Sequence, residues 1–370
     1  MWRRLPLVAL TVFLAIPPLR FAVLTATAPE LDFSKPDWKA REALIARARV
    51  LVSDPPNSVP LGGARTVTDV SCRFVPKPAK ATTAKFDCRL ENGDVVKVKY
   101  GRSRERQGEV AATGLLAALG FGADHVSTVE RVRCYGCPPW PFQLRLLAEQ
   151  FLLAPLVERT LDYGDARDFR WVSIERKIEG RAIEIDDFEG WDWRELSLVK
   201  SSAGGASAAE LDALRLIAVF LAHWDNKATN HRLLCVGDSQ DTHDPAAPCD
   251  KPLLMLQDVG ATFGPGKVIF KKWAPLPIWK DSGTCLVSME TLPYDGILFP
   301  PVRISEGGRA LLANRLRKLS TAQVHALFQH ARFPDPVTGE IPARDLTPWV
   351  RAFEDKVRQI TDRSPCPSVP

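Results

Sequence analysis

The stretch from His223 to Asn230 constrains this chain more than any other, because it gathers several reactive side chains directly after an apolar, helix-like run. His223, Asp225, Lys227 and Asn230 occur there in the spacing His-x-Asp-x-Lys-x-x-Asn. Asp258 follows 28 residues after Asn230, behind a second apolar run and immediately before Val-Gly. This arrangement predicts that two carboxylates and one amide, distant in the chain, meet at a single site.

These residue types are the ones that phosphoryl transfer requires. Asp225 can accept the proton of an attacking hydroxyl, and Lys227 can neutralise charge on the transferred group. Asn230 and Asp258 offer the amide and carboxylate oxygens that hard divalent cations prefer. We therefore expect Asp225 and Lys227 to be catalytic and Asn230 and Asp258 to be metal ligands.

The spacing resembles the catalytic loop of the protein-kinase-like superfamily, and Asp258-Val-Gly resembles the metal-binding Asp-Phe-Gly of those enzymes. Secreted kinases of the secretory pathway are the nearer comparison, and HipA-like kinases a more distant one. The resemblance implies a bilobal α+β fold, with a β-rich N-lobe that carries one inserted helix and a mainly helical C-lobe. It also implies ATP or another nucleoside triphosphate as donor and Mg²⁺ or Mn²⁺ as cofactor.

The order of expected elements fits such a fold. Strands are expected at Val70–Val75, Lys85–Leu90, Val95–Tyr100, His125–Arg133 and Arg170–Ile178, and helices at Gly108–Leu119, after the Ser207 capping box, and at Gly307–Arg317, Thr321–His330 and Pro348–Ile360. We place a β-rich N-lobe at residues 66–182 and a helical C-lobe, with the catalytic and metal-binding loops, at 183–370. After Gly260 there is no Ala-Pro-Glu element, so the usual platform for a protein substrate is not supported.

Two lysines of the third expected strand are candidates for binding the nucleotide. Lys97 and Lys99 are two residues apart and therefore share one face of the strand. In kinases a lysine of this strand pairs with a glutamate of the next helix to hold the α- and β-phosphates, which implies this role for Glu109. Position within the strand slightly favours Lys97 over Lys99.

The connection between the first two strands departs from the kinase pattern. Kinases carry a glycine-rich phosphate loop there, whereas residues 77–83 contain no glycine. We expect the hydroxyls of Thr82 and Thr83 to cap the phosphates instead. The missing glycines also favour an alternative, a catalytically inactive kinase-like binding protein of the cell envelope.

The first residues resemble an export signal. A basic start is followed by an apolar stretch from Leu5 to Ile16 and by Ala26-Thr27-Ala28, although Pro29 is a poor residue after a cleavage site. We expect residues 1–28 to be a signal peptide or signal anchor and 29–65 a Pro-rich leader; a buried N-terminal strand or helix is the alternative. The protein would then be periplasmic, extracellular or in a secretory lumen.

The cysteines agree with export, since an even number in an exported chain indicates disulfides. All eight follow residue 70. A hairpin folded about Lys80 would place Cys72 opposite Cys88 and Phe74 opposite Phe86, which predicts a disulfide between these two cysteines. Cys235 and Cys249 bracket a polar, Pro-rich insertion, and we expect a second disulfide to close that loop. The other cysteines, Cys134, Cys137, Cys285 and Cys366, cannot be paired from the sequence. Zinc is disfavoured, because only one Cys-x-x-Cys is present.

Composition excludes other classes of protein. The net charge of +5 is too small to indicate a nucleic-acid partner, and no apolar run is long enough for a membrane span in the mature chain. The expected partners are a nucleotide and a hydroxyl acceptor, which is a protein, a glycan or a small molecule. A structural or interaction module of the envelope is a third possibility, but it leaves the spacing of residues 223–230 unexplained.

Overall fold

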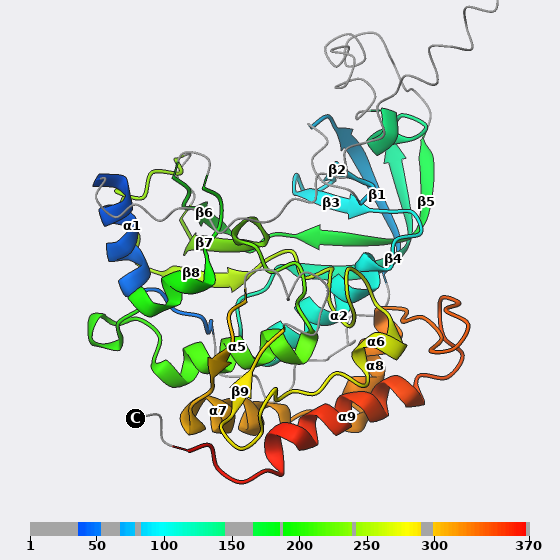
Figure 1. The fold of residues 1–370 in the computed structure, drawn as a ribbon. Coiled ribbons are helices and arrows are strands. Elements are labelled where there is room, and N and C mark those ends of the chain that lie inside the picture. The colour runs from blue at the N-terminus through cyan, green and yellow to red at the C-terminus, as the bar shows by residue number, and fades with distance from the viewer. Residues whose placement is uncertain are drawn as a thin grey trace, which may run out of the picture.

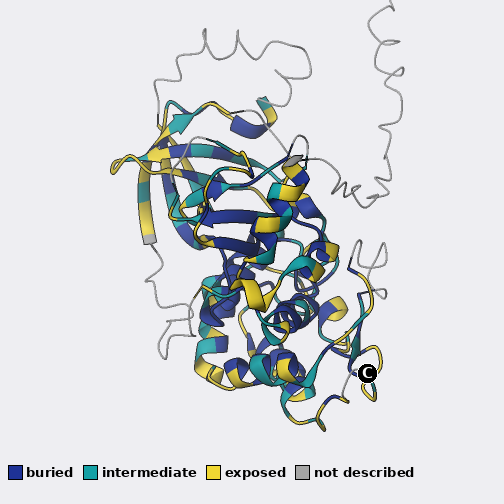
Figure 2. Cartoon of the chain, turned by 90° about the vertical axis from the view of Figure 1, so that its left-hand side faces the viewer, coloured by how far each residue is buried: buried dark blue, intermediate teal, exposed yellow. Residues whose placement is uncertain are grey.

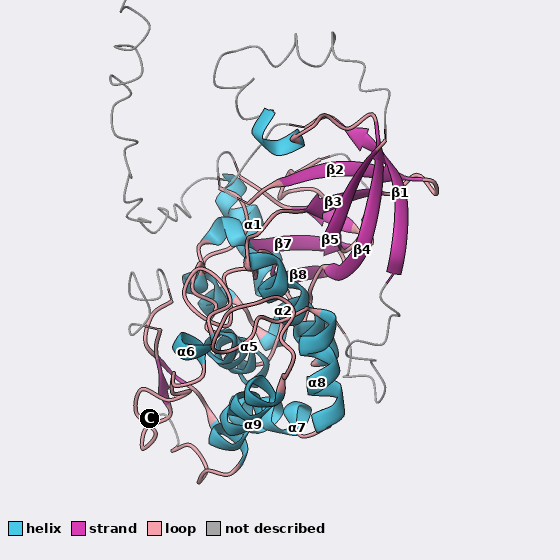
Figure 3. Ribbon diagram, turned by 90° about the vertical axis from the view of Figure 1, so that its right-hand side faces the viewer, coloured by secondary structure: helices cyan, strands magenta, loops and turns pink. Residues whose placement is uncertain are grey.

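The computed structural model describes residues 36–52, 67–77, 83–144, 166–185, 188–238, 242–289 and 299–367. These residues form a mixed α+β fold, in which strands predominate before residue 183 and helices after it (Figure 1). Figure 3 shows the larger sheet at one end of the molecule and most helices gathered at the other.

The larger sheet is closed, in the strand order β1-β2-β3-β5-β4, with β1 and β4 paired in parallel. Its strands are β1 (Val67–Val75), β2 (Lys85–Leu90), β3 (Val95–Lys99), β4 (His125–Tyr135) and β5 (Arg167–Arg176). Side chains of β3 alternate between two faces, so Val96 and Val98 are buried inside the closed sheet while Lys97 and Lys99 lie on its other face. Helix α2 (Glu105–Ala118) connects β3 to β4. The sequence predicted a helix at this point, over Gly108–Leu119.

The first hairpin has the predicted disulfide in a different register. Cys72 and Cys88 are bonded, with their Cα atoms 5.6 Å apart. Phe74, however, lies opposite Cys88 and not opposite Phe86, a difference of two residues from our prediction. A shift by two keeps every side chain on its own face. Strand β1 is also paired with β4, so its register depends on two neighbours and not on the hairpin alone.

All eight cysteines lie within the described residues, and they form four disulfides. The predicted Cys235–Cys249 pair is present. The cysteines that the sequence could not pair form Cys134–Cys137 and Cys285–Cys366. The last of these joins residues 81 positions apart and attaches the C-terminal segment to the helical part.

A second, smaller sheet lies beside the helices. It is antiparallel, in the order β6-β7-β8, and consists of β6 (Gly180–Ala182), β7 (His231–Val236) and β8 (Pro252–Leu256). Its strands carry the two polar segments that the sequence singled out, because residues 223–230 end at the start of β7 and Asp258 follows β8. Because β7 and β8 are antiparallel, both segments lie at the same end of the sheet.

The helices of this half lie to one side of the sheet, with α5 between the sheet and α7 (Figure 1). The described helices after residue 183 are α5 (Ala208–Leu221), α6 (Phe270–Trp273), α7 (Glu306–Leu316), α8 (Thr321–His330) and α9 (Thr347–Thr361). The same part contains the short strands β9 (Leu286–Val287) and β10 (Val302–Arg303) and the 3₁₀ turns η1 (Trp193–Leu198), η2 (Ser201–Ala203) and η3 (Ala228–Asn230). The predicted capping box is formed, because Ser207 and Glu210 bond each other's backbone N–H groups. Figure 2 shows the resulting buried interior.

The region expected to be a Pro-rich leader contributes to the core. Residues 29–65 include helix α1 (Pro36–Ala46), whose Leu44 and Ile45 are buried. The Arg41 side chain, fully buried, pairs with Glu195 at 2.8 Å. We missed this helix because Arg41 interrupts its apolar stripe and makes the segment look solvated. Residues 1–35, with the predicted signal, lie outside the described residues.

Within the described residues, no helix is both long and apolar enough to cross a membrane.

Candidate functional site

A cavity of about 630 Å³ lies between the closed sheet with α2 and the smaller sheet. The predicted site residues that line it are Lys97, Lys99, Glu109, Lys227, Asn230 and Asp258. Its volume is within the range of small-molecule sites. Thr83, Thr82 and Asp225 are not among the described residues that line it: Thr82 is outside the described part of the chain, and Thr83 donates instead to the carboxylate of Glu105.

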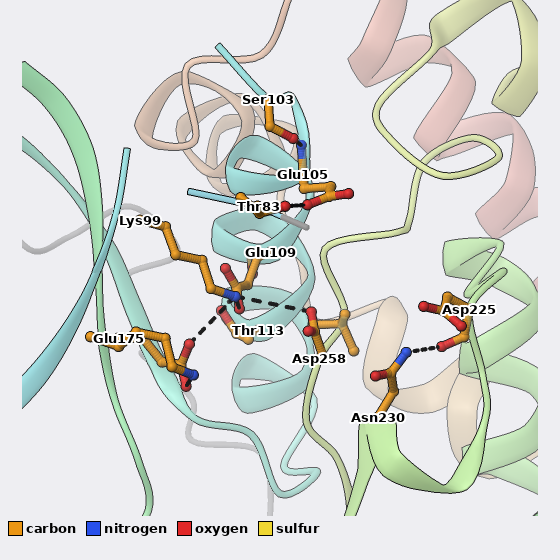
Figure 4. A network of polar contacts seen from close by, with 12 residues as sticks. Thr83, Lys99, Ser103, Glu105, Glu109, Thr113, Glu175, Asp225, Asn230 and Asp258 are labelled. Carbon is orange, nitrogen blue, oxygen red and sulfur yellow. Dashed lines mark hydrogen bonds and ion pairs between the residues drawn. The ribbon is translucent and has the colours of Figure 1, made fainter. Parts of the chain in front are cut away.

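Lys99 is at the centre of the ionic contacts (Figure 4). Its Nζ lies 2.5 Å from Oε1 of Glu109, 3.5 Å from Oε2 of Glu175 and 4.0 Å from Oδ1 of Asp258. Burial of Lys99 would lower its pKa, but the negative charge of Glu109 raises the pKa above its ordinary value. The ammonium group therefore stays charged in the cavity.

The slight preference for Lys97 was wrong with respect to Glu109. Lys97 pairs with Glu175 at 2.5 Å, whereas Lys99, the last residue of β3, contacts the helix. The alternation of side chains along a strand predicts which face a lysine occupies. It does not predict which end of the strand lies nearest α2. Both lysines line the cavity, as their shared face predicted.

Glu175, which sequence reasoning missed, supports both lysines. It lies on β5, directly opposite Lys97 in the strand register, and its side chain is only 4% exposed. Burial would raise the pKa of Glu175, but the charges of Lys99 and Lys97 lower it to about 2. The available signal was an acidic residue in the strand-like run Trp171–Glu175, where its side chain falls among valine, isoleucine and tryptophan.

Asp258 and Asn230 are held side by side by the backbone. The N–H of Asp258 donates to the carbonyl of Asn230 at 3.0 Å, and so does the N–H of Gln257. The Asp258 side chain is 47% exposed and faces Lys99. Burial would raise the pKa of Asp258, but the nearby ammonium of Lys99 holds it below its ordinary value.

The loop of residues 225–230 is fixed by amide hydrogen bonds. Asn230 donates from Nδ2 to the carbonyl of Asp225 at 2.6 Å, and Asn226 donates to the carbonyl of His223 at 3.0 Å. The Asp225 carboxylate lies 3.2 Å from Nζ of Lys227, which does line the cavity. Asp225 thus stands beside the cavity, in contact with two of its lining residues.

Helix α2 lies directly against the segment that follows Asp258. A Cβ at Gly108 would come within 2.6 Å of the carbonyl oxygen of Gly260. At the other end of α2, Arg315 donates to the carbonyl of Leu119. This close approach brings Glu109, one position after Gly108, to the same side as Asp258.

The residues at the cavity fit a divalent cation. Asp258 offers a half-exposed carboxylate, and Asn230, adjacent to it, offers an amide oxygen whose Nδ2 is already used in a hydrogen bond. Oxygen ligands of this kind, completed by water and phosphate oxygens, are typical of Mg²⁺ and Mn²⁺ sites.

Comparisons with known proteins give little more. No family model matches the chain, and no curated protein matches it. A similar solved structure is that of the Helicobacter pylori proinflammatory kinase CtkA, with a TM-score of 0.41 and 9% sequence identity over 80% of this chain and 97% of that one. The functional interpretation therefore rests on the residues of the chain itself.

Proposed function

We propose that this protein is a kinase-like phosphotransferase, which moves a phosphoryl group from a nucleoside triphosphate to a hydroxyl acceptor. The observation that carries the proposal is the contact of Lys99 with Glu109 and Asp258 at one cavity, beside the loop that bears Asp225 and Asn230. The six residues to which this chemistry assigns a role come from three separate stretches of sequence, and they lie in or beside the same cavity.

In this proposal each group acts on a stated bond. Asp225 accepts the proton of the acceptor's hydroxyl group while the oxygen of that hydroxyl group bonds to the terminal phosphorus of the donor. The bond between that phosphorus and the bridging oxygen of the donor breaks, and the nucleoside diphosphate leaves. Lys99, oriented by Glu109, contacts the donor phosphates, and Lys227 faces the transferred group.

Asn230 and Asp258 would hold Mg²⁺ or Mn²⁺, which supplies positive charge beside the phosphates. The same proposal assigns the β-rich part, residues 66–182, and the helical part, residues 183–370, to the two lobes of a kinase-like fold. It also assigns the protein to a compartment outside the cytoplasm, with which the four disulfides are compatible.

The test is incubation of the purified chain with γ-labelled ATP and either Mg²⁺ or Mn²⁺. We expect ATP plus metal to raise the melting temperature and label to appear on the protein, on an added acceptor or as free phosphate, with chelation of the metal abolishing transfer. Asp258→Asn should lose turnover, while Asp250→Asn, at an exposed position in the preceding loop, serves as the matched control.

Two results would change the proposal. If the parent chain shows neither nucleotide-dependent stabilisation nor transfer, hydrolysis or autophosphorylation, the proposed function fails. If it binds nucleotide but never turns over, the chain is the inactive binding protein that the glycine-free loop of residues 77–83 favours.

A further inference from the structure

We infer that the cavity recognises its donor through the phosphate chain and not through the base, so that inorganic tripolyphosphate occupies the same site as nucleoside triphosphates. This inference rests on the proposed function and specifies the donor class. Three observations carry it: a row of lysines, the polar lining of the cavity, and the engaged backbone of the connection between β5 and β6.

The lysine row extends beyond the two residues of β3. Lys85, at the start of β2, lies directly opposite Lys99 in the register and lines the same cavity. Like charges directly opposite on neighbouring strands are destabilising. The fold nevertheless keeps Lys85, Lys97 and Lys99 on one wall, and a polyanion placed against them would offset their repulsion.

Lys85 is the member of this row that is available to a ligand. Lys97 and Lys99 each have a carboxylate at 2.5 Å. Lys85, by contrast, has no carboxylate within ion-pair distance among the described residues, although it is partly buried. Lys177, exposed at the rim of the cavity, likewise lacks an ion pair within the described part of the chain. Lys85 therefore supplies the charge that would otherwise come from the backbone of a glycine-rich loop.

The rest of the lining offers little to a nucleobase. Bases bind by stacking on aromatic or apolar side chains and by hydrogen bonds along one edge. Among the described residues that line the cavity there is no Phe, Tyr or Trp, and the two imidazoles there are already engaged: His231 is stacked on Trp191, and His243 lies 3.0 Å from the carbonyl oxygen of Ala182. The aliphatic side chains there are only those of Ala182, Ile183 and Leu233, and most of the other described lining residues are charged or polar.

Three polar groups of the backbone between β5 and β6 are already hydrogen bonded within the protein. The N–H of Ile178 donates to Oδ1 of Asp124 at 2.8 Å, and its carbonyl accepts from Arg232 at 3.4 Å. The carbonyl of Glu179 accepts from the N–H of Gly237 at 3.1 Å. A base that reached this connection would find these groups occupied, so the phosphates provide the main contacts.

The test compares ATP, GTP, CTP, UTP, adenosine and inorganic tripolyphosphate, with Mg²⁺ held in excess, by calorimetric titration of the full chain. We expect the four nucleotides to bind within about threefold of one another, tripolyphosphate to displace ATP within about tenfold of that affinity, and adenosine to show no displacement. Base selectivity of 30-fold or more, or displacement by adenosine but not by tripolyphosphate, would overturn the inference.

A matched pair of variants tests the lysine row. Lys85→Gln should weaken all triphosphates by about tenfold, as expected for one lost charged contact, and Lys85→Arg should restore most of the affinity. Lys318→Gln, at an exposed position after α7 and away from the cavity lining, should change nothing. Unchanged binding by a folded Lys85→Gln protein contradicts the inference, although the proposed function survives as long as the parent binds nucleotide. A parent that binds none of these ligands refutes both.

Discussion

The two walls of the cavity are built in different ways. On the wall of β3 and α2, the side chains of Lys99 and Glu109 are only 7% and 2% exposed, and direct ionic contacts hold them. On the opposite wall, the Asp258 side chain is 47% exposed, and the Asp225 side chain, just beside the cavity, is 26% exposed; hydrogen bonds of the backbone and of Asn230 hold their loops. The first wall thus consists of buried charges, whereas the carboxylates on the second side are partly exposed and are held by neutral groups.

Because of this difference, substitutions on the two walls should have different effects on stability and on turnover. Removing one member of a buried ion pair leaves an uncompensated charge in a poorly solvated place, which is strongly destabilising. Removing a half-exposed carboxylate leaves water to solvate its neighbours. Substitutions on the first wall should therefore affect folding and binding together, whereas those on the second should affect turnover alone.

The largest effect is expected for Lys99→Met, which leaves Glu109 and Glu175 without their shared cation. The free energy of unfolding should fall by about 3–5 kcal/mol, measured by urea denaturation, and nucleotide binding should be lost. The double variant Lys99→Met/Glu109→Leu should regain much of the stability but not the binding. If Lys99→Met is as stable as the parent, the buried-charge description of this wall is incorrect.

Asp225→Asn should act almost only on turnover. Removing a general base typically costs a factor of about 10²–10⁴ in rate. The melting temperature should stay within about 2 °C of the parent, and nucleotide affinity should be unchanged, because Asp225 does not line the cavity. Lost nucleotide binding, or normal turnover, would show that the two walls do not divide their roles in this way.

Acidification should weaken the second wall through His223, which lies beneath the 225–230 loop. Burial lowers the pKa of this fully buried imidazole to about 4. Between pH 4 and 6.5 the unfolded chain binds a proton that the folded chain does not, so stability falls as pH decreases through this window. The full contribution is roughly 3 kcal/mol. His223→Leu should reduce the slope of the stability profile from pH 7 to 4 in thermal melts, and the slope that remains comes from the neighbouring His231, whose pKa burial lowers to about 3. An unaltered slope would exclude His223 as a cause.

Lys97→Met should have the smallest effect on stability and binding. It therefore tests whether the two lysines of the first wall differ in importance. The Lys97 side chain is 23% exposed, and Lys99 remains 3.5 Å from Glu175 when Lys97 is removed. We expect a loss of about 1 kcal/mol in stability and a weakening of triphosphate binding by less than tenfold. If the loss of stability equals that of Lys99→Met, both lysines stabilise the buried wall to the same extent.

Much of the architecture could be predicted from local patterns. Strand β2 and helix α8 have the predicted bounds, because turn residues and a capping box delimit them. The meeting of Asn230 with Asp258 also followed from sequence, since each residue immediately adjoins a buried strand. Strand parity correctly placed Lys97 and Lys99 on one face of the sheet.

Other features depend on packing between distant segments. The choice of Lys99 over Lys97 for the contact with Glu109 reflects where α2 lies, and the register of Cys72 and Phe74 reflects the pairing of β1 with β4. Helix α1 was missed because the burial of Arg41 requires its distant partner Glu195. Such pairings involve long-range contacts that no single stretch of sequence reveals.

The close packing of Gly108 on Gly260 has a consequence for how the chain tolerates substitution. Because a single methyl group is too large for that contact, α2 can lie this close to the Asp258 segment only while position 108 has no side chain. A larger residue there would push the helix away and lengthen the distance from the Lys99–Glu109 pair to Asp258. In the proposed phosphotransferase, the geometry of the charged cluster therefore depends on a position that contributes no chemical group of its own.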